Sequence, residues 1–271
     1  MSHHLPSDQE IRGRIEAVED EQTRMAFKYQ YLIAGRISEV CGAYAPRGED
    51  CFPVDFDGVL AVLFAVKTAK RRGRLRPVAL PLSVDLEPWA DQVREYFAYH
   101  RGEYPFRLHE NWETSKTYAM KRATEALRGL EWPMIEYTRT AVKPVEEEEI
   151  LDVRIDNKGR EMYLVSEAGG KKWYARDEEG YIRYGVKIPN RWKHATSHVL
   201  RKRRTVTLLY DYEFSGIELA LYGGWTLQSQ AENMPQALKH YLYLDMSAST
   251  GILSVLKKQA KRYFPKLLRK P

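Results

Sequence analysis

Between Val59 and Leu80 the chain reads VLAVLFAVKTAKRRGRLRPVAL. The apolar run with β-branched residues that begins this stretch, and the shorter apolar return from Leu75 to Leu80, predict two antiparallel strands. The basic residues around Gly73 predict the turn between them. Residues 67–76 carry no acid, so the turn of this predicted hairpin is strongly positive.

Helical patterns surround the hairpin. Apolar residues recur at helical spacing from Asp8 to Val40, and Ser7-Asp8-Gln9-Glu10 is typical of a capped helix start, so two helices are expected there. Residues 42–58, rich in Gly, Pro and Asp, predict a loop. Further helices are expected over residues 89–99, 115–128, 195–211, 215–222, 235–244 and 250–263.

Residues 145–188 have a different pattern. Polar and apolar residues alternate, and turn signals such as Asn157-Lys158-Gly159 and Gly169-Gly170 divide them. This pattern predicts an antiparallel meander of three or four strands. The expected fold class is therefore α+β: mainly helical over residues 1–271, with a small antiparallel hairpin and sheet.

Composition limits the classes of protein that fit. The chain has 271 residues and a net charge of +6, which favours a polyanionic partner. It has no apolar run of membrane-spanning length and no signal-peptide pattern, so we expect a cytoplasmic protein and no membrane partner. Cys41 and Cys51 lack metal-ligand spacing, so no zinc site is predicted, and we expect two free thiols or, in a hyperthermophile, one disulfide.

The charges are segregated along the chain. Residues 201–204 read RKRR, and residues 246–271 hold seven Lys or Arg and no acid, whereas Glu146–Glu149 form an acidic run. This arrangement suits one face on DNA and another in solvent. For each run taken alone, a solvated helix surface is the alternative interpretation.

Cleaving a phosphodiester without metal requires a nucleophile, fixed cations on the phosphate oxygens and a proton donor for the leaving oxygen. The sequence offers such groups in one order: Arg36 with Glu39, Lys67, His198 with Arg201, Trp225 and Tyr241. Singly these signals are weak, since Arg36 and Glu39 form a common helix-surface pair and Tyr241 is one of eighteen tyrosines. Their conjunction carries the prediction.

In this order the groups resemble the tyrosine recombinase (phage integrase) family. Residues 35–39, GRISE, are similar to its first arginine box, Lys67 to the lysine of its β-hairpin, and His198-Val-Leu-Arg201 to its HxLR box. Trp225 occupies a position that holds His in most members and Trp in some, and Tyr241 matches the nucleophile. The resemblance covers about residues 8–260.

The resemblance implies that family's catalytic-domain fold and a site-specific recombinase that cleaves and rejoins DNA through a 3′-phosphotyrosine. Arg36 and Arg201 would hold the scissile phosphate, Lys67 would protonate the leaving 5′ oxygen, and His198 would assist proton transfer. Trp225 would donate to a phosphate oxygen, and Glu39 would be a structural residue that orients Arg36 or a neighbouring turn. No metal or other cofactor is implied. Expected DNA contacts are Lys70, Arg71, Arg72, Arg74, Lys202, Arg203 and Arg204.

The implied partners are double-stranded DNA and further copies of the chain, as a dimer or tetramer on DNA. The expected setting is nucleoid-associated, or encoded by a virus or mobile element. The sequence departs from the family in three ways. Trp225 and Tyr241 are sixteen residues apart, which leaves Tyr243 as an alternative nucleophile. Residues 145–188 look like an insertion, and residues 1–271 are expected to lack the family's N-terminal core-binding domain, either because the chain is truncated or because it is a naturally short member.

Other classes compete with this prediction. A type IB topoisomerase would use a similar pocket, although the HxLR box beginning at His198 favours a recombinase. A non-catalytic DNA-binding relative and a plain helical structural protein are the remaining alternatives. In the basic tail, residues 250–263 carry an apolar helical stripe, which would either pack onto a neighbouring protomer on DNA or fold back onto its own core.

Overall fold

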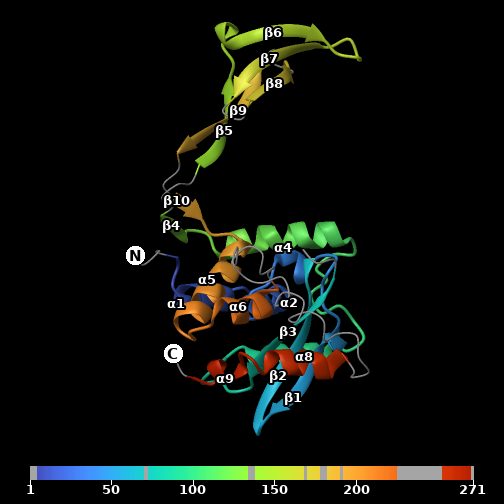
Figure 1. The fold of residues 1–271 in the computed structure, drawn as a ribbon. Helices are drawn as coiled ribbons and strands as arrows, with labels where there is room; N and C mark the ends of the chain where they lie inside the picture. Colours follow the sequence, from blue (N-terminus) through green and yellow to red (C-terminus); the bar gives the residue numbers. More distant parts are fainter. Residues whose placement is uncertain are drawn as a thin grey trace, which may run out of the picture. The chain divides into compact units, whose positions relative to one another are not determined.

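The structure is a computed structural model, which describes residues 5–69, 73–133, 138–167, 170–177, 182–189, 192–224 and 252–269. The chain forms two compact units. The main unit contains Leu5–Leu130 and the chain from Ala195 onward, and the strand unit is built from Glu131–His194. Both units are drawn in Figure 1. The class is mixed α+β, as expected.

The main unit begins with two helices. Helix α1 (Asp8–Glu16) starts at Ser7, whose hydroxyl accepts from the backbone of Glu10 while the Glu10 carboxylate accepts from Ser7 N–H, so the predicted capping box is confirmed. Helix α2 (Glu21–Leu32) is buried along most of its length, which makes it the central helix of the unit. It ends earlier than expected, and only a short 3-10 turn, η1 (Ile37–Glu39), follows.

The predicted hairpin is confirmed as β2 (Val59–Lys67) and β3 (Leu75–Pro81), with Lys67 opposite Leu75. The prediction of a loop over residues 42–58 is wrong in its second half. A 3-10 turn, η2 (Gly48–Asp50), leads into β1 (Cys51–Phe56), which pairs antiparallel with β2. Pro53 has no N–H to donate and so argued against a strand. However, β1 lies at the edge of the sheet β1-β2-β3, where one side of the strand has no neighbour and a proline can be accommodated.

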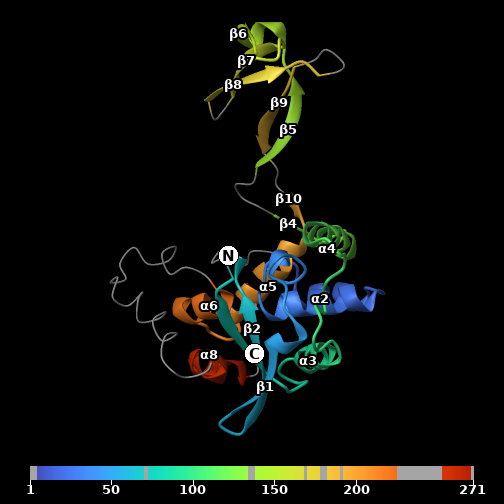
Figure 2. The ribbon, with the colours of Figure 1, turned by 90° about the vertical axis from the view of Figure 1, so that its right-hand side faces the viewer.

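Helices cover this sheet. Figure 2 shows the strands between α3 (Ala90–Tyr99) on one side and α6 (Gly216–Gly223) and α8 (Ile252–Ala260) on the other. The aromatic core lies between α2, α3 and the sheet, where the rings of Phe64 and Phe97 lie 5.3 and 5.1 Å from that of Tyr29. Helices α4 (Trp112–Ala126), α5 (Ser197–Tyr210) and α9 (Phe264–Leu267) complete the unit. The helix predicted over 235–244 lies outside the described residues.

The basic tail packs against its own unit. Val255, Leu256 and Ala260 of α8 are buried, and α8 and α9 both contact β3. The Tyr263 hydroxyl donates to Pro77 O at 2.9 Å and accepts from Ala79 N–H at 3.0 Å, so it pairs with backbone groups of this edge strand. Of the two alternatives for the tail, the structure has the one in which the stripe folds back.

The strand unit contains the predicted meander. Strands β6 (Ile150–Ile155), β7 (Glu161–Glu167) and β8 (Gly170–Ala175) form an antiparallel sheet in that order, after a 3-10 turn, η4 (Glu147–Glu149). A small core of Tyr163, Val165 and Ile182 supports it. Two further antiparallel pairs are β5 (Thr138–Pro144) with β9 (Arg183–Pro189), and β4 (Glu131–Pro133) with β10 (Trp192–His194).

Cys41 is buried, Cys51 is partly buried, and both are free thiols. None of the helices in the described part of the chain has the length and apolar character that crossing a membrane requires.

Candidate active site

Glu39 is the centre of a cluster of arginines. Its side chain is fully buried, and its Oε1 lies 3.1 Å from Arg36 Nη1. Its Oε2 lies 3.5 Å from Arg76 Nη2 and 3.9 Å from Arg201 Nη1. The carboxylate also accepts from the backbone N–H groups of Arg36 and Ala69, each at 3.1 Å. Glu39 therefore contacts Arg36, and the same carboxylate contacts two further guanidinium groups.

The end of α2 supplies acceptors for two of these arginines. Ala34 has a positive φ of 46°, a left-handed conformation that is uncommon for residues other than glycine. The carbonyl oxygen of Ile33 accepts from Arg76 Nη2 at 2.9 Å, and that of Ala34 accepts from Arg201 Nη1 at 2.7 Å. Arg36 and Glu39 were expected on one face of an α-helix, which is wrong because α2 ends at Leu32 and the pair spans the turn η1.

The end of α6 supplies two more acceptors. The carbonyl oxygen of Tyr222 accepts from Arg76 Nη1, and that of Gly223 accepts from Arg201 Nη2 at 3.2 Å. Gly224 caps this helix with a φ of 66°. A Cβ on Gly224 would lie 2.6 Å from Thr68 Cγ2 and from Arg76 Cδ, so only glycine allows the hairpin to come this close. Four segments that are distant in sequence thus meet around Glu39.

The cluster carries a surplus of positive charge, because three guanidinium groups surround one carboxylate. Burial raises the pKa of Glu39, but Arg76, the N–H groups of Arg36 and Ala69, and Arg201 lower it, and the net direction is down. Burial, Arg76 and Arg36 lower the pKa of Arg201 to about 9, while Glu39 raises it. A site with this imbalance favours binding an anion, which would offset the repulsion among the arginines.

Lys67 lies at the end of β2, two residues before Ala69, whose N–H reaches Glu39. Its ammonium group forms an ion pair with Asp50 at 2.8 Å, and its side chain is 32% exposed. His198 is exposed on α5, one turn before Arg201. The hairpin and α5 thus bring the segments of Lys67 and His198 to the arginine cluster. Trp225, Tyr241 and Tyr243 lie outside the described residues.

The residues expected to contact DNA differ in burial. Arg204 is wrong as a DNA contact, because its side chain is 1% exposed and forms a buried ion pair with Glu87. Its guanidinium also donates to the Tyr222 hydroxyl at 3.3 Å. Lys202 and Arg203 are half-buried on α5, and Arg74 is exposed in the hairpin. Lys70, Arg71 and Arg72 lie outside the described residues.

Arg76 is a residue of the cluster that the sequence motifs did not predict. Its side chain is 4% exposed, and its strand neighbours Pro77, Val78 and Ala79 are buried as well. The available signal was an arginine within an apolar strand, since a buried guanidinium requires a carboxylate or several carbonyl oxygens as partners. The carbonyl oxygens of residues 33, 34, 222 and 223 carry no sequence signal, because any residue has one.

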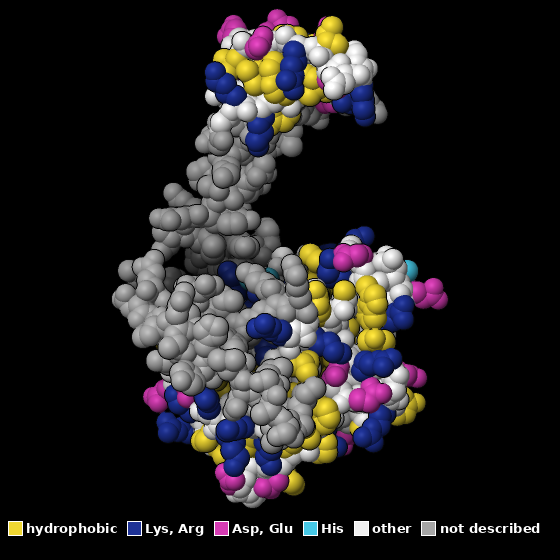
Figure 3. All heavy atoms as spheres, turned by 45° about the vertical axis from the view of Figure 1, so that its right-hand side comes forward, with side chains coloured by type: hydrophobic (Ala, Val, Ile, Leu, Met, Phe, Trp, Pro, Cys, Tyr) yellow, Lys and Arg dark blue, Asp and Glu magenta, His cyan; other side chains and the backbone are white. Residues whose placement is uncertain are grey.

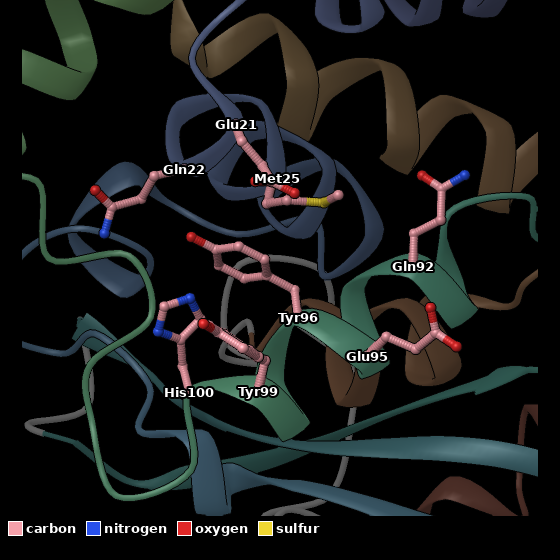
Figure 4. Close-up of a pocket in the computed structure, with 8 residues that line it drawn as sticks. All are labelled: Glu21, Gln22, Met25, Gln92, Glu95, Tyr96, Tyr99 and His100. Atoms are coloured by element: carbon pink, nitrogen blue, oxygen red, sulfur yellow. The ribbon is translucent and has the colours of Figure 1, made fainter.

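Away from the arginine cluster, the main unit has a hollow of about 830 Å³ between α2 and α3. Figure 4 shows the side chains that line it: Glu21, Gln22, Met25, Gln92, Glu95, Tyr96, Tyr99 and His100. None of the candidate residues lies here, and the two glutamates disfavour a phosphate. Among the described residues no group of His, Cys, Asp and Glu could hold a metal ion.

Comparison with known proteins finds no match for this chain: no family model, no curated protein and no solved structure is significantly similar to it.

Proposed function

We propose that this chain is the catalytic domain of a tyrosine-type site-specific DNA recombinase. The observation that carries the proposal is the cluster of Arg36, Arg76 and Arg201 around Glu39. Residues that the recombinase motifs predicted from separate parts of the sequence, Arg36, Glu39 and Arg201, are in contact in the fold. The excess of guanidinium groups over carboxylate suits the non-bridging oxygens of a phosphodiester.

The contacts suggest different roles for the three arginines in binding a phosphate. Arg76 and Arg201 are held by carbonyl oxygens from two segments each, so their guanidinium groups are fixed before a substrate binds. Arg36 is the most exposed of the three, at 24% of its side chain. It can keep one bond to Glu39 and offer its remaining N–H groups to a phosphate oxygen, since a guanidinium has five donors.

The proposed cleavage consists of an attack by Tyr241 and the release of the 5′ oxygen. The Tyr241 hydroxyl attacks phosphorus and passes its proton to His198 or solvent, the bond from phosphorus to the 5′ oxygen breaks, and Lys67 protonates that oxygen. Lys67 must first leave Asp50, with which it is paired in the free protein. The 3′-phosphotyrosine keeps the energy of the bond for rejoining, and the partners of the whole reaction are double-stranded DNA and further copies of the chain.

A covalent adduct tests the proposal. The intact chain is incubated with duplexes that contain a randomised segment and a nick, which traps the cleaved strand, and SDS-stable complexes are recovered and sequenced. We expect an adduct that forms in the presence of EDTA and disappears in Tyr241→Phe. Tyr243→Phe is the matched control and should retain the adduct.

The outcomes separate the alternatives. An adduct lost in Tyr243→Phe and kept in Tyr241→Phe would move the nucleophile to the second tyrosine. Relaxation of supercoiled plasmid without strand exchange would assign the site to a type IB topoisomerase. DNA binding with no adduct from any duplex in the pool would leave a DNA-binding module and overturn the proposed catalysis.

A further inference from the structure

Strand β6 leaves an apolar edge open in the strand unit. It lies at one edge of the sheet β6-β7-β8, and within the described residues no strand pairs with its outer side. Figure 1 shows it at that edge. Three of its side chains are large, apolar and exposed: Leu151 at 50%, Val153 at 52% and Ile155 at 70%. Figure 3 shows hydrophobic side chains, in yellow, on the surface of this unit.

The backbone of β6 points toward a partner at Val153. Val153 lies opposite Tyr163 of β7, and its N–H donates to the side chain of Asp152 at 2.9 Å. Next to the turn, Asp156 N–H donates to Arg160 O at 2.9 Å, so the alternation of an antiparallel ladder makes Val153 and Tyr163 a pair without backbone bonds. In an antiparallel pair, a residue that makes no backbone bond to its neighbour on one side directs its N–H and C=O to the other side. Val153 therefore presents both groups at the open edge, which is the arrangement that accepts another strand.

The charges of β6 are arranged symmetrically about Val153. Asp152 precedes it and Arg154 follows it, and both side chains lie on the face opposite to that of Val153. If a second β6 pairs antiparallel with Val153 opposite Val153, each Asp152 comes opposite an Arg154 of the other copy. Ile155 then comes opposite the β-bulge that β6 has at Leu151. Cross-strand pairs of opposite charge and of apolar side chains stabilise a sheet, whereas like charges opposite each other destabilise it.

The flanking residues favour the same antiparallel direction. The acidic run Glu146–Glu149 precedes the strand, and Lys158 and Arg160 follow it, with Arg160 paired to Asp156. An antiparallel pair puts the acidic run of one copy beside Lys158 of the other, whereas a parallel pair would put the two acidic runs together. The hydrogen-bond pattern agrees as well: Asp152 and Arg154 would form pairs without backbone bonds, which bring side chains closest.

We propose that the strand unit binds a second copy of this chain through β6, forming one continuous sheet with Val153 on the twofold axis. The pairing covers the exposed side chains of Val153 and Ile155 and extends the apolar face that begins at Tyr163 and Val165. On pairing, the N–H of Val153 no longer donates to the Asp152 side chain and donates to the carbonyl oxygen of Val153 in the second copy. The surface is independent of the arginine cluster, so the interaction requires no DNA.

Cysteine cross-linking tests the register in the full-length chain. Paired residues that exchange backbone bonds have Cα atoms about 5.5 Å apart, within the range of a disulfide. Val153→Cys should therefore form a covalent dimer with a mild oxidant. Ile155→Cys is the matched control, because it is at least as exposed, but its copies would lie about 13 Å apart along the strands. The unmodified chain measures the background from Cys41 and Cys51.

A charge exchange tests the partner. In the Val153→Cys background, Asp152→Arg alone and Arg154→Asp alone should each reduce the dimer yield severalfold, since each places like charges opposite one another. The double variant Asp152→Arg/Arg154→Asp should restore the yield, and circular dichroism checks that every variant is folded. Equal cross-linking of Val153→Cys and Ile155→Cys, or a double variant no better than the singles, would overturn the proposal.

Discussion

Arg76 Nη2 lies 2.9 Å from the carbonyl oxygen of Ile33, although the two residues are separated by 43 positions in the sequence. The bond joins the return strand of the hairpin to the end of α2. Through its other terminal nitrogen Arg76 also binds the end of α6. One side chain therefore fixes three segments of the candidate site, and this is a different task from that of the more exposed Arg36.

Arg76→Ala and Arg36→Ala should separate stability from catalysis. Arg76→Ala leaves a buried carboxylate and two carbonyl oxygens short of partners, so we expect a loss of about 3–5 kcal/mol in the free energy of unfolding. Arg36→Ala breaks a partly exposed ion pair, for about 1 kcal/mol or less, but slows DNA cleavage by roughly a hundredfold. Urea unfolding and single-turnover cleavage measure the two effects, with Arg101→Ala as an exposed control outside the expected DNA contacts. Equal losses of stability would contradict the division between the two residues.

Gly224→Ala should destabilise the main unit more than a glycine change of similar backbone conformation. Both Gly224 and Gly102 lie in the main unit and have a positive φ, of 66° and 89°, but a Cβ at Gly102 meets no atom within 4 Å. Gly102→Ala therefore measures backbone strain alone, about 1–2 kcal/mol. Gly224→Ala adds the collision with Thr68 and Arg76, for about a further 1–3 kcal/mol. Thermal unfolding of the two variants compares them, and equal melting temperatures would rule out the close approach.

Sulfate should stabilise the folded protein at pH 7 and lose this effect as the pH rises through about 9, the pKa of Arg201. An anion binds the charged guanidinium, which is the dominant form below this pKa. Because that pKa lies below the ordinary arginine value, the charged form is costly in the free protein, and sulfate offsets this cost. The shift in melting temperature with sulfate, against chloride at equal ionic strength, measures the effect, and Arg36→Gln should reduce it. An equal shift at pH 7 and pH 10 would argue against Arg201 as the anion ligand.

Tyr263→Phe should destabilise the main unit although only a hydroxyl is removed. The buried N–H of Ala79 and the carbonyl oxygen of Pro77 both lose a partner, at a cost of about 1–3 kcal/mol in the free energy of unfolding. Tyr210→Phe is the control, because Tyr210 is 71% exposed. If both variants unfold at the same urea concentration, the tail is not an integral part of the fold.

The sequence predicted the elements whose signals are local. Strands β2 and β3 are apolar runs on either side of a basic turn that contains glycine, and α1 begins with a capping box. The hairpin and the start of α1 were therefore predicted correctly. Strand β1 was missed because Pro53 and the neighbouring aspartates resemble a loop, and only its pairing with β2 makes it a strand. The exact end of α2 depends on the partners of the Ile33 and Ala34 carbonyls, which lie far along the chain.

For the candidate site, the sequence identified Arg36, Glu39 and Arg201 but misjudged their surroundings. The run RKRR looked uniformly exposed, yet successive helical residues point in different directions. Arg201 and Arg204 are one turn apart and both face inward, while Lys202 and Arg203 are less buried. Arg76 was overlooked because an arginine in a strand is ordinarily interpreted as a surface residue. Only the position of Glu39, which is distant in the sequence, shows that Arg76 has a buried partner.

The two crossings of the chain between its units are adjacent. Ala195 N–H donates to Leu130 O at 2.9 Å within the main unit, and the next residues outward, Glu131 and His194, are paired in β4 and β10. The main unit is therefore spatially continuous without residues 131–194, as though residue 130 ran directly into residue 195. A segment attached in this way can be gained, lost or exchanged during evolution as a single block, at one point of the surface, without rearranging the arginine cluster. Divergence can proceed at different rates in the two parts, so the strand unit is free to acquire a partner of its own while the arginine cluster of the main unit stays the same.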